Sequence, residues 1–99
     1  MKILEKYLVK SPETASRIIE GEAVVVLPKI SQVSTFNEVA TRIWQLCDGN
    51  KKTSEIIDQI EDEFDAETQQ IKTDCLAFIT QLVEQHMLLA SDKKMSSYD

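Results

Sequence analysis

Residues that usually carry chemistry are scarce in this chain of 99 residues. It has one histidine, His86, and two cysteines, Cys47 and Cys75, none of which stands in a CxxC or HxxxH spacing. A metal site needs three or four ligands, so the sequence predicts no metal centre. Two cysteines also make no disulfide framework, and we expect both to be reduced core residues.

Glycine is equally scarce, with two positions in the whole chain. Neither GxGxxG, GxxxxGK[ST] nor GxSxG occurs, so no phosphate-binding loop or nucleophile elbow is predicted. Carboxylates are abundant, but acidic helix faces are usually just solvated and indicate no acid–base pair. We therefore predict a protein that is not an enzyme and needs no cofactor.

Long hydrophobic runs are missing as well. No stretch approaches the ~20 apolar residues of a membrane span, and Lys2, Glu5 and Lys6 place charges where a signal peptide needs apolar residues. The net charge is −6, from 11 basic and 17 acidic residues, which disfavours nucleic acids and anionic membranes as partners. These features predict a soluble cytoplasmic protein that binds neither nucleic acids nor membranes.

What is present is a run of short strands followed by helices. Residues 15–19 and 23–27 are apolar runs on either side of Gly21, which predicts a β-hairpin, and residues 31–36 predict a third strand. Asn37 suits the N-cap of the first of three helices. The pattern over residues 4–9 is ambiguous for a strand. We expect one domain over residues 1–90 and a disordered polar tail over residues 91–99.

Three strands followed by three helices define an α+β fold, with a winged-helix-like order of a three-stranded antiparallel sheet and then a three-helix bundle. That order often occurs in DNA-binding proteins, so a transcriptional regulator is one alternative. Against it stands the segment from Ser54 to Glu67, which has no Lys or Arg and would be repelled by phosphates. Its acidic residues are Glu55, Asp58, Glu61, Asp62, Glu63, Asp65 and Glu67.

The last helix, over about residues 67–87, is apolar over more of its surface than one core stripe requires. The first stripe is a complete core stripe, and a second stripe extends the apolar arc and either packs on the sheet or lines a groove. If the third strand borders that groove as a sheet edge, its free N–H and C=O groups can pair with an extended peptide. A structural dimerisation module that uses the same stripe is a further alternative. The stripes are Ile71, Cys75, Phe78 and Leu82, and then Leu76, Ile79, Val83 and Met87.

Several short segments, taken in order, resemble the PqqD family over about residues 14–89. These small proteins belong to pyrroloquinoline quinone (PQQ) biosynthesis, and their fold is shared by the peptide-recognition elements of ribosomal natural-product (RiPP) pathways. The segments are Gly21–Leu27, Phe36-Asn37, Ile43–Gly49, Thr53–Ile57 and Asp74–Leu82.

The resemblance implies a peptide chaperone that binds the leader of a ribosomally made precursor peptide and presents it to a modifying enzyme, often a radical SAM enzyme. The leader adds a strand to the sheet and packs against the last helix. Either the PQQ pathway or a related peptide pathway fits, and so does a monomer or a weak homodimer. The implied contact residues are Gln32, Val33, Ser34, Thr35 and Phe36 on the strand, and Lys72, Leu76, Ile79 and Val83 on the helix.

Overall fold

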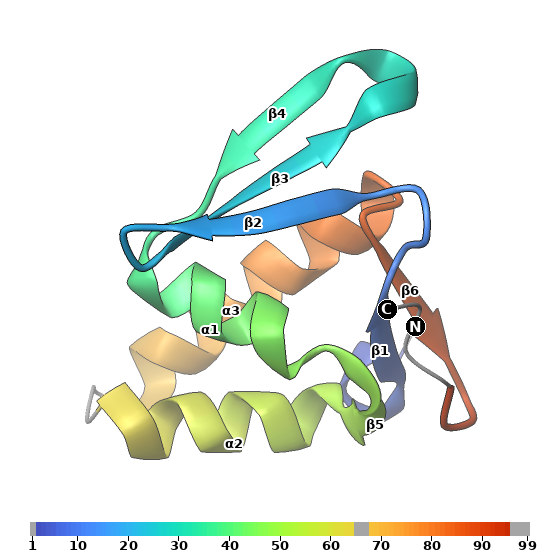
Figure 1. The fold of residues 1–99 in the computed structure, drawn as a ribbon. Helices are drawn as coiled ribbons and strands as arrows, with labels where there is room; N and C mark the ends of the chain where they lie inside the picture. The colour runs from blue at the N-terminus through green and yellow to red at the C-terminus, as the bar shows by residue number, and fades with distance from the viewer. Residues whose placement is uncertain (1, 65–67, 96–99) are drawn as a thin grey trace.

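The computed structural model describes residues 2–64 and 68–95. In this part of the chain two three-stranded antiparallel sheets flank three α-helices (Figure 1), so the predicted α+β class is confirmed. The strands are β1 (Tyr7–Lys10), β2 (Ala15–Ile19), β3 (Glu22–Leu27), β4 (Gln32–Thr35), β5 (Asp48–Lys52) and β6 (Leu88–Ser91). The helices are α1 (Glu38–Leu46), α2 (Thr53–Phe64) and α3 (Thr68–Glu84), with short 3-10 turns η1 (Ile3–Glu5) and η2 (Pro28–Ile30).

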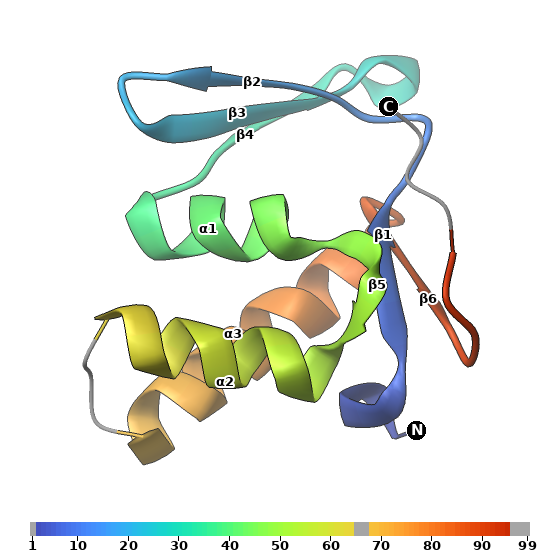
Figure 2. The ribbon, with the colours of Figure 1, turned by 60° about the horizontal axis from the view of Figure 1, so that its bottom comes forward.

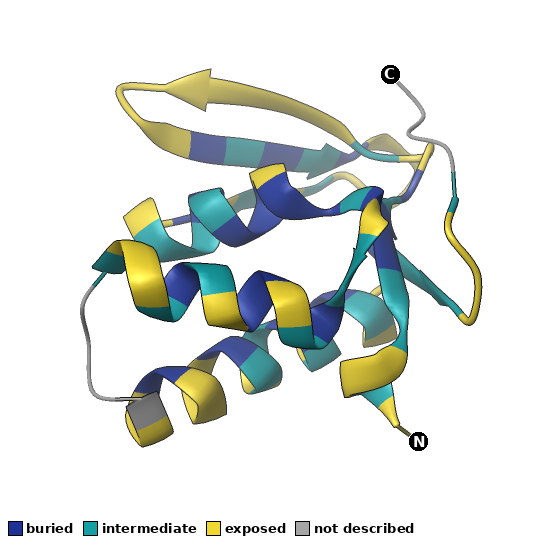
Figure 3. Ribbon diagram, turned by 90° about the horizontal axis from the view of Figure 1, so that it is seen from below, coloured by how far each residue is buried: buried dark blue, intermediate teal, exposed yellow. Residues whose placement is uncertain are grey.

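The first sheet has the strand order β2-β3-β4 and lies over α1 (Figures 1 and 2). It contains the predicted hairpin and the predicted third strand, so both predictions are confirmed. Ala23, Val25 and Leu27 of β3 point into the core, because side chains alternate along a strand. β2 is exposed along its whole length, as the yellow strand in Figure 3 shows.

The second sheet, β5-β1-β6, was not predicted as a sheet. β1 pairs with β6 from Tyr7↔Ser91 to Lys10↔Leu88, so the first and last strands of the described chain lie side by side (Figure 2). Leu8 and Val9 are both buried, so β1 lacks the alternation that identifies a strand. The predicted winged-helix-like order, with one sheet before the helices, therefore describes only the first sheet. The second sheet joins segments that lie before, between and after the helices in the sequence.

The helix ends follow local chemistry. Asn37 caps α1 as predicted, since its side chain accepts a hydrogen bond from the Ala40 N–H at 2.9 Å. α3 ends before the predicted residue 87, because His86 adopts φ 63°. There Met87 N–H donates to the Leu82 carbonyl, a Schellman end that usually places glycine where His86 stands.

The end of the chain differs in part from the predicted tail. Ser91 is the last residue of β6, and the Met95 N–H donates to the Gly49 carbonyl at 2.8 Å. Residues 96–99 lie outside the described part. No helix in the described part combines the length and the apolar character that a membrane span requires.

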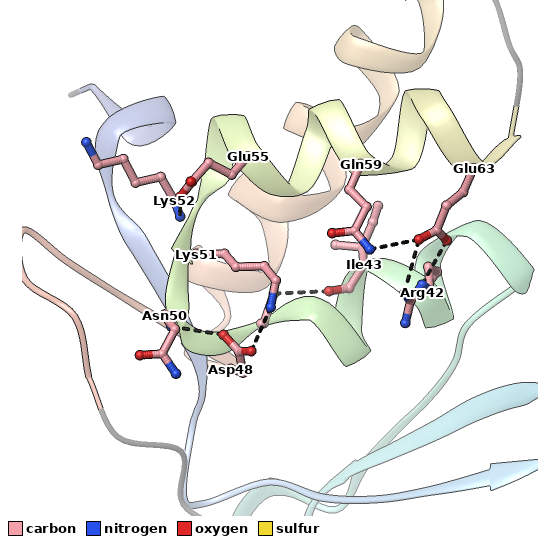
Figure 4. Close-up of polar contacts among 10 residues, drawn as sticks. Arg42, Ile43, Asp48, Asn50, Lys51, Lys52, Glu55, Gln59 and Glu63 are labelled. Carbon is pink, nitrogen blue, oxygen red and sulfur yellow. Dashed lines mark hydrogen bonds and ion pairs between the residues drawn. The ribbon is translucent and has the colours of Figure 1, made fainter.

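Polar contacts tie α1, β5 and α2 together at one side of the molecule (Figure 4). Arg42 forms a bidentate pair with Glu63, with N–O distances of 2.8 and 3.1 Å, and Gln59 donates to the same carboxylate. The pair lowers the pKa of Glu63 below its usual value, chiefly through the hydrogen bond from Arg42. Within β5, Asp48 accepts a hydrogen bond from Lys51 at 2.7 Å. The Arg42–Glu63 pair thereby joins α1 to α2.

Candidate functional site

β4 is an edge of the first sheet, because it pairs with β3 on one side and no described strand pairs with it on the other. The Phe36 N–H donates to the Ala23 carbonyl, which makes this residue pair a hydrogen-bonded one. Hydrogen-bonded and non-bonded pairs alternate along an antiparallel ladder. Thr35 and Val33 are therefore the residues whose N–H and C=O groups point away from β3, toward the free edge.

The side chains of β4 alternate in the same way. Gln32 and Ser34 are half-buried, while Val33 and Thr35 are exposed, and Val33 keeps 64% of its surface. Val33 thus points into solvent rather than into the core. A strand added at this edge would alternate likewise, with every second side chain turned toward α3.

α3 lies beside β4 and is held there by aromatic contacts. Phe36, the residue after β4, meets Phe78 of α3 edge to face, with ring centroids 5.1 Å apart. Phe36 also meets Trp44 of α1 at 5.7 Å. At the other end of β4, Gln32 Nε2 lies 4.0 Å from Met87 Sδ, just beyond α3. The side of α3 that carries Phe78 is therefore the side next to β4.

The four helix residues of the predicted site have different surroundings. Ile79 is fully buried in the core, and Lys72 and Leu76 line a hollow beside α2 and η1. Val83 is half-buried against the core. On a helix with 100° per residue, Leu76 and Phe78 are about 160° apart, so they cannot share one groove wall. An aromatic contact joins residues 32–36 to Phe78, and peptide binding at Lys72, Leu76, Ile79 and Val83 stays a prediction.

A cavity of about 530 Å³ continues the edge of β4 past its last residue. It lies between the first turns of α1 and the N-terminal half of α3, and its wall is apolar with a polar rim. Sequence reasoning missed it because its lining comes from two helices that are distant in sequence. The lining residues are Asn37, Val39, Ala40, Ile43, Gln70, Ile71, Asp74, Cys75 and Phe78.

The titratable groups near this cavity can help to bind a ligand but are not poised to react with one. Burial raises the pKa of Cys75, and the neighbouring Asp74 raises it further. Burial raises the pKa of Cys47 to about 12, and its thiol donates to the Ile43 carbonyl. Both thiols are thus protonated near neutral pH, the form that is a poor nucleophile. No three His, Cys, Asp or Glu residues in the described ranges are grouped so that they could hold a metal ion.

Residues 22–88, from the start of β3 to the start of β6, match the family model of coenzyme PQQ synthesis protein D (PqqD). The chain belongs to the PqqD family. The matched segment contains β4, α3 and the cavity between α1 and α3, so the candidate site lies in the part of the chain that the family model covers.

One curated relative and two solved structures are similar to this chain. The PqqA binding protein of Rhodopseudomonas palustris (strain BisB5) is 34% identical over 65 residues, which are 66% of this chain and 62% of that protein. The chain thus matches less than two thirds of that relative's length.

The solved structure of TbiB1 in complex with the TbiA(beta) leader peptide has a TM-score of 0.72 and 25% identity, with 81% of this chain and 93% of that chain covered. A lasso peptide synthetase B1 complexed with the leader peptide has a TM-score of 0.71 and 23% identity, with 84% and 98% covered. The second match shows a shared fold.

Proposed function

We propose that this protein is a non-catalytic adaptor that binds the leader of a ribosomally made precursor peptide and presents it to a modifying enzyme. The observation that carries the proposal is the free edge of β4 beside the Phe78 side of α3. Two similar proteins support it: the Rhodopseudomonas relative is a PqqA binding protein, and TbiB1 was solved with a leader peptide.

Binding by strand addition follows from the geometry of that edge. The N–H and C=O groups of Val33 and Thr35 are available to a guest strand, and each backbone hydrogen bond contributes about 0.5–1.5 kcal/mol net. Main-chain pairing accepts any sequence except proline at a paired position, so specificity has to come from side chains. The apolar cavity beyond Thr35 is where the protein discriminates between the side chains of different guest peptides.

The strand half of the predicted site, residues 32–36, stays in this proposal. The helix half changes from Lys72, Leu76, Ile79 and Val83 to the residues of α3 that face β4 and the cavity, above all Asp74 and Phe78. A guest strand laid along β4 reaches these two positions because they share the side of the helix next to that edge.

We also propose that the protein catalyses no reaction and that it acts in the cytoplasm. The two protonated thiols support it, because neither is poised as a nucleophile. A radical SAM enzyme is the proposed type of modifying enzyme, in the PQQ pathway or a related one, and the adaptor acts as a monomer or a weak homodimer. This part rests on the family resemblance.

A nuclear magnetic resonance titration tests the proposal. The ¹⁵N-labelled protein is mixed with synthetic candidate leader peptides. We expect the largest amide shifts at residues 32–36 and 74–78. Shifts concentrated on β2, or on the hollow beside Lys72 and Leu76, would contradict the proposed site. A scrambled leader of the same composition serves as the control.

A further inference from the structure

The cavity at the end of β4 contains one acidic group at its rim. Asp74 is exposed, and its Oδ1 accepts a hydrogen bond from Gln70 Nε2 at 3.0 Å. In the described ranges the ion pairs are Lys6–Asp92, Lys29–Glu13, Arg42–Glu63 and Lys51–Asp48, so Asp74 has no cationic partner there. Gln70 orients this carboxylate at the mouth of an otherwise apolar hollow.

The rest of the wall is suited to a large apolar side chain. Ile43 of α1 and Ile71 and Phe78 of α3 line the cavity, with Val39 and Ala40 beside them. Its volume of about 530 Å³ lies within the range of ~300–1,000 Å³ that is typical of small-ligand pockets. That volume holds one bulky side chain together with the apolar stem of a second residue.

The cavity is also within reach of a strand bound at β4. Asn37 lines it and stands two residues after Thr35, the last residue of the strand. Phe78 both lines it and contacts Phe36. An extended chain advances about 3.3 Å per residue, so a guest paired with Val33 and Thr35 reaches the cavity within the next few residues.

We infer that this cavity selects leaders that carry a large apolar residue next to a Lys or Arg, and that Asp74 is the residue that selects the positive charge. The inference rests on the proposed function and adds a sequence preference to it. A Lys or Arg side chain lays its methylene stem along apolar surface and leaves its charged end free, which suits the apolar wall and the acidic rim. An acidic residue at the same place is repelled by Asp74.

Selection from a library of displayed random 12-residue peptides measures this preference. The baits are the wild-type protein, Asp74→Asn, Asp74→Lys and the control Asp58→Asn. Asp58 lines the hollow on the α2 side of α3, so its variant makes the same charge change away from the cavity. We expect wild type and Asp58→Asn to enrich a large apolar residue with a neighbouring Lys or Arg. Asp74→Asn loses the basic preference and Asp74→Lys enriches Asp or Glu instead.

Affinities of one selected peptide give the size of the effect. Asp74→Asn should weaken its binding about three- to tenfold, while Asp58→Asn leaves binding within about twofold. Circular dichroism checks whether each variant is folded. If Asp74→Lys is unfolded, Asp74→Asn alone tests the inference.

The outcomes separate this inference from the proposed function. Peptides that shift residues 32–36 but show no basic preference, or keep it with Asp74→Lys, overturn the inference and leave the adaptor function standing. If no peptide binds at the β4 edge, the proposed function fails and the inference fails with it.

Discussion

Phe36, at the end of β4, and Phe78, in the middle of α3, meet edge to face with ring planes at 86°. Trp44 of α1 joins the same aromatic cluster through Phe36, at 71°. An aromatic pair of this geometry contributes about 0.5–1.5 kcal/mol beyond the burial of its area. The cluster connects the sheet edge to both helices that line the cavity, so it sets the width of the groove.

Replacing Phe78 tests that structural role. Phe78→Leu keeps an apolar side chain but removes the edge-to-face contact, and we expect a loss of about 1 kcal/mol in the free energy of unfolding. Urea unfolding followed by the fluorescence of the single tryptophan, Trp44, measures it. We also expect weaker leader binding, because the groove wall changes shape.

The matched control is Phe64→Leu, at the end of α2. Phe64 packs against the core, but it makes no aromatic pair within the described residues. This variant should lose some stability without losing affinity for the leader. Equal effects of the two variants on binding would show that Phe78 acts through general stability alone.

A proline substitution tests whether the backbone groups of β4 bind the leader. Thr35→Pro removes an N–H that points to the free edge and leaves the ladder to β3 intact, since proline is tolerated on an edge strand. We expect about tenfold weaker leader binding, which corresponds to the loss of one backbone hydrogen bond of about 1.4 kcal/mol. Isothermal titration calorimetry measures the change.

The control for Thr35→Pro is Ser16→Pro on β2. By the same alternation, Ser16 faces the free edge on the opposite side of the sheet. This variant removes an outward N–H of the same kind and should bind the leader as the wild type does. If Ser16→Pro abolished binding and Thr35→Pro did not, the guest strand would belong on β2.

The turn after α3 provides a stability prediction. His86 has φ 63°, in the left-handed region that costs a side chain about 1–2 kcal/mol. His86→Gly should therefore raise the free energy of unfolding by about 0.5–1 kcal/mol, after allowing for the greater freedom of glycine in the unfolded chain. Gln85→Gly, one residue earlier and outside that region, should lower it. A lower urea midpoint for His86→Gly would contradict this account of the helix end.

The sequence was sufficient for the first sheet and the helices. Val24-Val25-Val26 beside Gly21 identifies a hairpin, and Asn37 identifies the start of α1, because each signal is local. β5 reads Asp-Gly-Asn-Lys-Lys and has no apolar pattern at all. Its pairing with β1 depends on contacts between segments that are far apart, which no local pattern indicates.

The side of α3 that faces β4 is hard to predict from the sequence, for a related reason. The free edge at residues 32–36 follows from counting strands, but the apolar width of α3 does not say which neighbour covers which side. α3 packs against α2 and β6, and its Phe78 meets Phe36 just after β4. The Phe36–Phe78 contact decides the matter, and it is a tertiary feature.

The central claim is that a peptide adds a strand to β4, and amide hydrogen exchange tests it most directly. In the free protein the amides of Val33 and Thr35 face outward and should exchange fast, whereas those of Gln32 and Ser34 pair with β3 and should exchange slowly. A saturating leader peptide should slow exchange at Val33 and Thr35 by tenfold or more, as expected for about 1.4 kcal/mol per bond. Unchanged exchange at Val33 and Thr35 in the complex would contradict the claim.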